Sequence, residues 1–487
     1  VFKWGFNILH HIVKRGYSGG IFPINPRGGQ WFGRKVYASL DEIDEPIDLA
    51  VIVVADSLVL DTVKRCTAKR IPAGIVITAG FSETGQAGAS LEREIVAAAR
   101  TGGMRLVGPN TMGVYSGYPT IMHALMGSMP LQPGGVALVV QSGNLGSSIS
   151  YRFLRRKVGI SRLISSGNEA DLKLEDFLEY LEHDEKTRII CLYVEGLRDP
   201  RRFFESARRI SPVKPVVLIK GGRTGVGALA AMSHTGAMAG NDEIFCSMCR
   251  QSGIIQVQTM DEMVDVTGML MQPAIPGNRV VIITSGGGWG VLATDACESA
   301  GLLVEPLDPS LVQTLDRILP AYWSRGNPID LVAPSRVGVI TDTITELMEH
   351  AGVDAVLLMG LGYMSLRAMG WRKSDTLPQE VVRDAAEMMI REETRLFELV
   401  VELIGKYQRP IVSVIDIMSF DYRFENNPVD ILDGHGIMSY PAPDRAVFAL
   451  SRAASYHRWV RESAMPLHCS EAARATFDAL PFLERAT

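Results

Sequence analysis

The chain has 487 residues, enough for about three domains at roughly 150 residues each. Hydrophobic residues make up 47% and charged residues 21% of it, a balance that excludes global disorder and collagen-like repetition. The formal net charge of −5 argues against a general nucleic-acid binder, which would need a basic surface. We therefore expect a multidomain globular protein with several hydrophobic cores.

The cysteines and apolar runs indicate a cytoplasmic protein. Six cysteines are too few for a disulfide scaffold and suit a reducing compartment. Cys246 and Cys249 have the spacing of a redox or zinc pair, but no second pair accompanies them, so we interpret both as structural. No stretch approaches the roughly 18 to 20 apolar residues of a membrane span, and the first 20 residues do not resemble a secretory signal.

Short runs of β-branched residues recur along the chain, and each is followed by a turn and a helical pattern. Continuous apolar runs of this length predict parallel strands that are buried on both faces. Their alternation with helices predicts doubly wound α/β domains. The eight expected strands span residues 47–55, 73–80, 134–143, 188–196, 214–222, 278–287, 353–360 and 409–416.

The expected strands fall into three blocks, which we interpret as three consecutive doubly wound domains. The Pro/Gly/Asn-containing segment 272–278 separates the second block from the third. A charged helical insert is expected at about 365–408, with a solvated face that could serve as a contact surface. The expected divisions are domains at 1–125, 126–272 and 273–460, followed by a tail at 461–487.

Two glycine-rich turns share one pattern. Segments 136–149 and 279–296 both run from a strand through a Ser-Gly turn into a helix. Such a turn leaves free backbone N–H groups at the helix start, where Ser142 and Ser285 could add hydroxyl donors to an anion such as phosphate. Tight packing alone explains such turns about as often, so both interpretations stay open at this point.

A third glycine-rich segment, 221–242, contains a single histidine, His234. A lone histidine is usually structural or superficial. The small residues around His234 leave its ring unshielded, however, and an exposed imidazole can accept a phosphoryl group. A carboxylate bonded to the other ring nitrogen would strengthen that role, and Glu195, at the end of an expected strand, is the best candidate.

The segment 22–40 contains Asn25, Pro26 and Arg27, followed by two glycines. This turn holds a cation close to backbone donors and could bind a nucleotide phosphate. A plain surface turn would have the same composition, so the residues alone do not decide between these interpretations.

Taken together, these segments resemble the α-type part of the NDP-forming acyl-CoA synthetases, namely the ADP-forming acetate–CoA ligases and their relatives the succinyl-CoA synthetases. The matching pieces occur in order over residues 1 to about 455 and include INPRGG, GIVITAGFSETG, LVGPNTMGV, VVQSGNLG, SSGNEADL, YVEG, SHTGAMAG, TSGGGWGVLATDA and GNPIDL. The resemblance implies a Rossmann-like CoA-binding domain followed by two flavodoxin-like ligase domains.

The resemblance also implies roles for individual residues. His234 matches the phosphorylated histidine and Glu195 the carboxylate that steadies it. Two helix N-termini would receive the phosphate, and three turns together with the Asn25–Arg27 segment would contact coenzyme A. The phosphate-binding residues are Ser142, Gly143, Asn144, Ser285, Gly286 and Gly287; the CoA-binding residues are Asn25, Pro26, Arg27, Val54, Ala55, Ile77, Thr78, Ala79 and Asn110.

By this resemblance, the chain forms acyl-CoA from a carboxylic acid, CoA and ATP, or the reverse, through an acyl phosphate and a phosphohistidine. The family's first strand and glycine loop are expected to precede Val1 and so to be missing here. About 200 further residues would be needed for an ATP-grasp domain. We therefore expect either an ATP-grasp partner subunit, in a hetero-oligomer, or a fused domain that is not in this chain to bind ATP or ADP and Mg²⁺, with no metal held by this chain.

Two departures from the family pattern concern the acyl pocket. Trp289 stands where relatives commonly have proline, and its ring could either narrow the acyl pocket or simply pack. Ser147 stands where succinate-specific relatives present a tyrosine, which argues weakly against succinate. The alternative function is a non-catalytic, regulatory CoA-binding subunit of the same fold. The retention of His234, Glu195 and both phosphate turns argues against it. Citrate-directed chemistry would need an additional domain.

Overall fold

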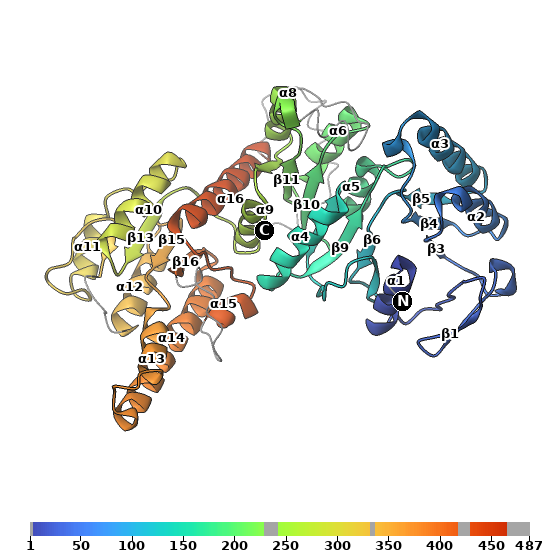
Figure 1. Cartoon of the computed structure of the whole chain (residues 1–487). Helices are drawn as coiled ribbons and strands as arrows, with labels where there is room; N and C mark the ends of the chain where they lie inside the picture. Colours follow the sequence, from blue (N-terminus) through green and yellow to red (C-terminus); the bar gives the residue numbers. More distant parts are fainter. Residues whose placement is uncertain (1–2, 228–241, 332–336, 417–428, 465–487) are drawn as a thin grey trace. The chain divides into compact units, whose positions relative to one another are not determined.

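The computed structural model describes residues 3–227, 242–331, 337–416 and 429–464. The chain forms two compact units, Val1–Met260 and Asp261–Thr487 (Figure 1). The α/β class with parallel sheets, predicted from the apolar runs, is confirmed. Each of the eight expected strands contains an observed parallel strand, because residues of these runs are buried on both faces of a sheet.

The first sheet of unit 1 has three parallel strands in the order β3-β4-β5. Because alternate residues of a strand point to opposite faces, Val76 packs beneath α2 and α3, whereas Ile75 packs toward α1. Short elements precede these strands and connect them. The elements of this part are α1 (Trp4–Lys14), β1 (Gly29–Trp31), β2 (Arg34–Val36), η1 (Leu40–Glu42), β3 (Leu49–Ile52), α2 (Asp56–Ala68), β4 (Ala73–Val76), η2 (Ser82–Thr84), α3 (Gln86–Thr101) and β5 (Arg105–Val107).

The second sheet of unit 1 has seven strands in the order β12-β11-β10-β8-β9-β6-β7. The strands from β12 to β9 are parallel, and β6 and β7 add an antiparallel edge. Helices α5, α6 and α8 pack on one face, and α4 contacts β8 and β9. The elements are β6 (Gly113–Ser116), β7 (Met122–Leu125), β8 (Val136–Val140), α4 (Gly143–Arg155), β9 (Ile160–Ser165), α5 (Leu174–His183), β10 (Ile189–Val194), α6 (Pro200–Ile210), β11 (Val216–Lys220), α8 (Asp242–Gln251) and β12 (Ile255–Val257).

The order of the parallel strands fixes where a ligand can bind on the second sheet. The chain places β9 on one side of β8 and then β10, β11 and β12 on the other, which is the flavodoxin-like order. The loops after β8 and β10 therefore diverge to opposite faces. In open α/β sheets, the crevice at such a switch point is where ligands bind, beyond the carboxyl ends of the strands.

Unit 2 repeats this arrangement on a sheet of four parallel strands in the order β14-β13-β15-β16, with its switch point between β13 and β15. Helices α11, α12 and α14 cover one face, and α10 and α16 pack together beside β13 and β16. The elements are α9 (Met260–Leu270), β13 (Val280–Thr284), α10 (Gly287–Ser299), α11 (Pro309–Leu315), β14 (Ile329–Asp330), α12 (Val337–Glu349), β15 (Ala355–Met359), α13 (Tyr363–Arg372), α14 (Gln379–Tyr407), β16 (Ile411–Val414), α15 (Val429–Gly434) and α16 (Pro443–Ala464).

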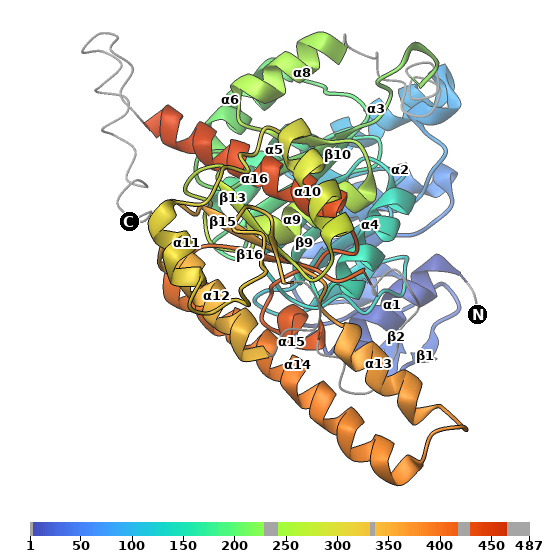
Figure 2. The ribbon, with the colours of Figure 1, turned by 90° about the vertical axis from the view of Figure 1, so that its left-hand side faces the viewer.

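The helical insert expected at about 365–408 corresponds to α13 and α14, which pack side by side as a hairpin (Figures 1 and 2). The buried Glu393 of α14 ties the two helices together, because its carboxylate accepts hydrogen bonds from the amides of Gly362 at 2.6 Å and Ser365 at 2.8 Å. An anion is favourable at the start of α13, where the helix dipole is positive.

The sheets also bear on the expected domain limits. Strands β6 and β7 lie within residues 1–125 but belong to the second sheet. The boundary between the two compact units falls after Met260, ahead of the expected break at 272–278. The three-domain division stays a prediction. Among the described residues, no helix is long and apolar enough to cross a membrane.

Candidate functional site

The switch point of the seven-stranded sheet brings together two predicted site segments. Ser142 follows β8 and Glu195 follows β10, and these two strands are direct neighbours in the sheet. The loops remain in contact beyond the strands, because the amide of Gln141 donates to the carbonyl of Tyr193 at 3.2 Å. The predicted phosphate-binding turn at Ser142 and the predicted carboxylate of Glu195 thus lie at the same edge of the sheet.

Ser142 is the N-cap residue of α4, and Gly143 and Asn144 form its first turn. No side chain in the described part of the chain caps this turn, so its amides remain able to bind an anion. A Cβ atom at Gly143 would lie 1.9 Å from Cγ of Met112, so the close approach of the 108–112 loop requires glycine here. The helix start is therefore shaped by a neighbouring loop as well as by its own sequence.

Glu195 is buried, with 7% of its surface exposed, and is held from several directions. Its amide donates to Oε1 of Gln141 at 2.5 Å, and its carbonyl accepts from Nζ of Lys220 at 2.7 Å. The hydroxyl of Tyr193 hydrogen-bonds its side chain, and burial, reinforced by this carboxylate, raises the pKa of Tyr193. Burial lowers the pKa of Lys220, which remains beside two carboxylate-bearing residues. Hydrogen bonds to its amide and its carbonyl therefore fix the backbone that carries the Glu195 carboxylate.

Sequence reasoning missed two residues of this site, Gln141 and Glu169. Gln141 Nε2 donates to Oε1 of Glu169 at 3.0 Å, and Ser166 Oγ donates to the same oxygen at 2.7 Å. Burial raises the pKa of Glu169 to about 7, although both hydrogen bonds oppose the shift. Both residues lie in segments that carried the family resemblance, but neither segment alone reveals that they meet in space.

The three turns predicted to contact coenzyme A meet at the carboxyl edge of the first sheet. Val54 and Ala55 follow β3, residues 77–79 follow β4, and Asn110 follows β5. Hydrogen bonds connect them: Thr78 Oγ1 donates to the carbonyl of Val54 at 2.6 Å, and the amide of Asn110 donates to the carbonyl of Thr78 at 2.9 Å. Ala55 also begins α2 without a side-chain cap. This edge offers backbone groups to a ligand, as a nucleotide site requires.

The turn that contains Asn25, Pro26 and Arg27 is built by its own backbone. The amide of Asn25 donates to the carbonyl of Tyr37 at 2.9 Å, and Oδ1 of Asn25 accepts from the amide of Arg27 at 3.0 Å. The turn leaves the Arg27 side chain exposed. It therefore offers a solvent-accessible cation, which can pair with an anionic ligand.

In unit 2, the predicted Ser285–Gly287 segment lies at the switch point between β13 and β15. Gly286 is the N-cap residue of α10, and no described side chain caps this helix. The loop after β15 lies against it, since a Cβ atom at Gly360, whose φ is +87°, would be 1.9 Å from Oγ of Ser285. The start of α10 therefore occupies the same position relative to its sheet as the start of α4 does in unit 1.

Trp289 lies on the first turns of α10 and packs against Tyr363, with ring centroids 5.4 Å apart. The hydroxyl of Tyr363 donates to Oδ2 of Asp416 at 3.2 Å, and burial together with this carboxylate raises the pKa of Tyr363. Trp289 therefore stands among side chains from the ends of β15 and β16.

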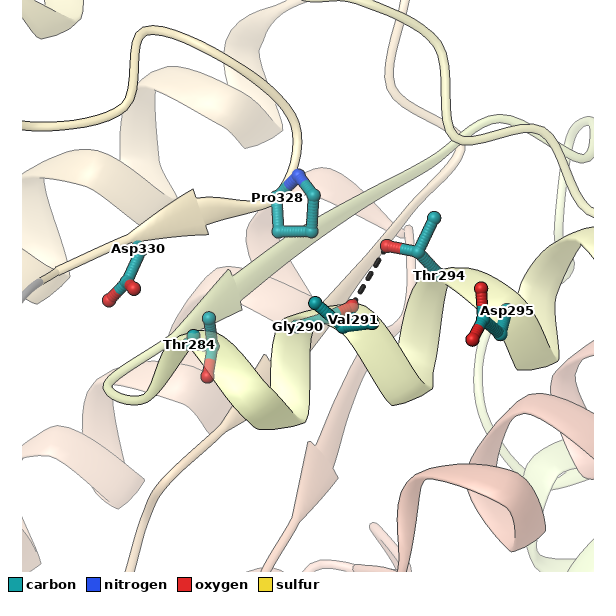
Figure 3. A pocket seen from close by; sticks show the side chains of 8 residues that line it. Thr284, Gly290, Val291, Thr294, Asp295, Pro328 and Asp330 are labelled. Carbon is teal, nitrogen blue, oxygen red and sulfur yellow. Dashed lines mark hydrogen bonds between the residues drawn. The ribbon is translucent and has the colours of Figure 1, made fainter.

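A cavity of about 330 Å³ lies along α10, on a side of the helix other than the one that carries Trp289. Figure 3 shows Pro328 and Asp330 facing the helix, with Thr284 near its start. Trp289 is not among the lining residues. The cavity is bordered by Thr284, Gly287, Gly290, Val291, Thr294, Asp295, Pro328 and Asp330.

The structure does not test the expected roles of His234 or of the Ser147–Trp289 pair. His234 lies outside the described residues. Ser147 lies on α4 of unit 1, whereas Trp289 belongs to unit 2, so the acyl pocket expected from this pair stays a prediction. No group of three or more potential metal ligands occurs within the described ranges, and Cys246 and Cys249 are both free thiols.

Family models match three segments of the chain. Residues 2–117 match a CoA binding domain, residues 133–270 a succinyl-CoA ligase like flavodoxin domain, and residues 280–385 a ligase-CoA domain. The fold and the matched segments together define a CoA-dependent ligase.

Relatives of the whole chain narrow this class. The α subunit of an ADP-forming acetate–CoA ligase I from Pyrococcus furiosus is 35% identical over 467 residues, and the match covers 94% of each chain. The ADP-forming 4-hydroxybutyrate–CoA ligase of Nitrosopumilus maritimus is 30% identical, over 93% of this chain and 61% of that one. A structure of the dinucleotide-forming acetyl-coenzyme A synthetase 1 of Ca. Korarchaeum cryptofilum, in complex with phosphate and ADP, superposes with a TM-score of 0.80 at 30% identity, covering 96% of this chain and 95% of that one. The chain belongs to the family of ADP-forming acyl-CoA ligases and is of the α-subunit type.

Proposed function

We propose that this chain carries the CoA and phosphohistidine chemistry of an ADP-forming acyl-CoA synthetase, with a small carboxylic acid as its substrate. The complete reaction would convert an acid, CoA and ATP into acyl-CoA, ADP and phosphate, or run in reverse. The observation that carries the proposal is that Glu195 and the uncapped start of α4 follow neighbouring strands at one switch point of the sheet.

In the direction of synthesis, the first two steps move a phosphoryl group. An imidazole nitrogen of His234 attacks the γ-phosphorus of ATP, so that an N–P bond forms and ADP leaves. The carboxylate of the acid then attacks the phosphorus of phosphohistidine; an O–P bond forms, the N–P bond breaks, and acyl phosphate results. Donors fixed around the phosphoryl oxygens stabilise such transfers, and the amides at Ser142, Gly143 and Asn144 would serve here.

In the third step, the CoA thiol attacks the acyl carbon. A C–S bond forms, the C–O bond to phosphate breaks, and the thiol proton passes to the departing phosphate or to solvent. Glu195 would accept a hydrogen bond from the second ring nitrogen of His234 and so hold the imidazole in one tautomer. Ser285, Gly286 and Gly287 would form the second phosphate-binding helix start.

Coenzyme A would bind at the carboxyl edge of the first sheet. The connected turns at Val54–Ala55, Ile77–Ala79 and Asn110 would contact it through backbone groups. Exposed Arg27, held by Asn25, would pair with its phosphates. Ser147 and Trp289 would shape the acyl pocket.

Nucleotide and Mg²⁺ would be bound by an ATP-grasp subunit in a hetero-oligomer. Family membership as an α-type chain supports a partner subunit. The described cysteines form no disulfide bond with one another, which agrees with a cytoplasmic location, and we include that location in the proposal.

The proposal is tested by labelling the chain with radioactive phosphate in the presence of acetyl-CoA. We expect one phosphate per chain, which is acid-labile and alkali-stable as a phosphohistidine is, and we expect His234→Ala to abolish it. His183→Ala, a change at an exposed histidine that ends α5, should leave the labelling unchanged. Full labelling of His234→Ala would overturn the assignment.

A further inference from the structure

The mechanism leaves one buried carboxyl group unused, that of Glu169. This residue follows β9, is 3% exposed, and has a φ of +56°, a left-handed conformation that is costly for a residue other than glycine. Its Oε1 accepts two hydrogen bonds, whereas its Oε2 has no hydrogen-bond partner among the described residues. A strained and incompletely paired buried carboxyl destabilises a fold, so a hydrophobic residue would be the better choice for packing alone.

Glu169 determines the orientation of the Gln141 side chain. The Nε2 group of Gln141 donates to Oε1 of Glu169 at 3.0 Å and to the carbonyl of Gly196 at 2.7 Å. Since both partners are acceptors, only the NH₂ end of the amide can face them. The Oε1 end is thereby directed to the amides of Glu195 at 2.5 Å and Gly196 at 3.1 Å.

The loop that carries Glu169 is itself fixed against the first sheet. The amide of Asn168 donates to the carbonyl of Pro109 at 2.9 Å, and the amide of Ala170 donates to that of Gly108 at 3.2 Å. Asp171, whose side chain is fully buried, pairs with Arg100 at 2.8 Å and with Arg105 at 3.0 Å. Glu169 thus has a rigid support that does not depend on Glu195.

We propose that Glu169 is a positioning residue for phosphoryl transfer, acting through the Gln141 amide to fix the backbone that carries Glu195. The inference rests on the proposed function of Glu195. Positioning matters here because a displacement of about 1 Å in a catalytic constellation can lower a rate by roughly a hundredfold. The chain of contacts runs from a loop supported by the CoA-binding sheet to the phosphoryl site.

The test measures the rate at which the chain, assembled with its ATP-grasp subunit, is phosphorylated from acetyl-CoA and radioactive phosphate. We expect Glu169→Ala and Gln141→Ala each to lower this rate by about tenfold or more, with the KM for acetyl-CoA unchanged. Glu169→Gln should keep the rate within about threefold, because a glutamine oxygen can still accept from Ser166 and Gln141. Glu182→Gln is the control: it alters a carboxylate that pairs with Arg209 at 2.7 Å and does not contact Glu169 or Gln141, so it should leave the rate unchanged.

A double-mutant cycle separates positioning from general damage to the fold. If Glu169 acts through Glu195, then adding Glu169→Ala to a Glu195→Gln protein should cause no further loss of rate. A further loss as large as in the wild-type background would overturn the proposal, as would a wild-type rate in both alanine variants. Should Glu169→Ala fail to fold, Gln141→Met permits the same cycle.

The outcome for the wild-type complex keeps the two hypotheses apart. If the wild-type complex takes up no phosphate, the proposed function fails. If it is phosphorylated at His234 and the cycle shows independent effects, the proposed function stands and the role of Glu169 is refuted.

Discussion

Replacing Glu169 by glutamine should change how the stability of the protein depends on pH. Burial raises the pKa of this carboxyl from 4.5 to about 7. Ser166, Gln141 and the charge of Arg198 act in the opposite direction, while the negative charge of Glu175 adds to the rise. The folded protein therefore retains a proton that the unfolded chain releases between these two values.

The sign and size follow from proton linkage. A raised carboxyl pKa means that the folded state binds more protons, so wild-type stability falls as the pH rises from about 4.5 to about 7. At about 1.4 kcal/mol per pKa unit, the difference of 2.5 units amounts to about 3 kcal/mol in total. Between about pH 5.5 and 8.5, the part that can be measured is about 2 kcal/mol. Glu169→Gln lacks this titration, so its stability relative to wild type should improve by that amount across the range.

Urea denaturation followed by circular dichroism at several pH values provides the assay. The exposed Glu94→Gln on α3 is the matched control, because its side chain lies in solvent and its curve should run parallel to that of wild type. Parallel curves for Glu169→Gln and wild type would contradict this prediction, because they would mean that Glu169 has the same pKa in the folded and unfolded states.

Three further changes test other parts of the account. Arg27→Ala should weaken CoA binding about tenfold in isothermal calorimetry, and the loss should be smaller at high salt, because salt screens the interaction of Arg27 with the CoA phosphates. Lys64→Ala, a change at another exposed cation, should leave the affinity for CoA unchanged. Equal losses of affinity in the two variants would contradict a specific contact of Arg27 with CoA. Asp171→Asn should lower the free energy of unfolding at neutral pH by about 1 to 3 kcal/mol in urea titrations, because its two arginine pairs are lost. The pKa of Asp171 is held low by these contacts although burial opposes them, so the gap from wild type should close as the pH falls below 3.8; a constant gap would contradict this. Gly143→Ala should lower the phosphorylation rate, and it should lower the free energy of unfolding by about 1 to 3 kcal/mol, because the added Cβ atom would clash with Met112. Adding Met112→Ala to the same chain should restore part of both quantities. No restoration would mean that this clash is not the cause of the loss.

The sequence predicts those parallel strands whose apolar runs are long and continuous. Strands β8, β13 and β15 are buried at every residue, and such apolar runs stand out against their surroundings. Strands β5, β6, β7, β9, β12 and β14 were not predicted: five of them have only two to four residues, and the apolar run of β9 is interrupted by Ser161 and Arg162. Edge positions of a sheet need less apolar character, so their pattern is weak.

The candidate site was predictable only where its residues stand next to recognisable turns. Ser285 and Glu195 directly follow apolar strands, and Ser142 follows one after Gln141, so the sequence indicates their place at the carboxyl edge of a sheet. Gln141 and Glu169 are separated along the chain and meet only because β9 pairs beside β8. No local pattern encodes such a contact. The partnership of Tyr193 and Lys220 with Glu195 could not be foreseen for the same reason.

The central claim is that a phosphoryl group on this chain is an intermediate that a nucleotide partner consumes. A chase experiment tests it most directly: the chain is phosphorylated from acetyl-CoA and radioactive phosphate, freed of both, and mixed with ADP, Mg²⁺ and the ATP-grasp subunit. We predict that the label leaves His234 and appears in the γ-phosphate of ATP. Label released only as inorganic phosphate, or retained on the chain, would contradict it.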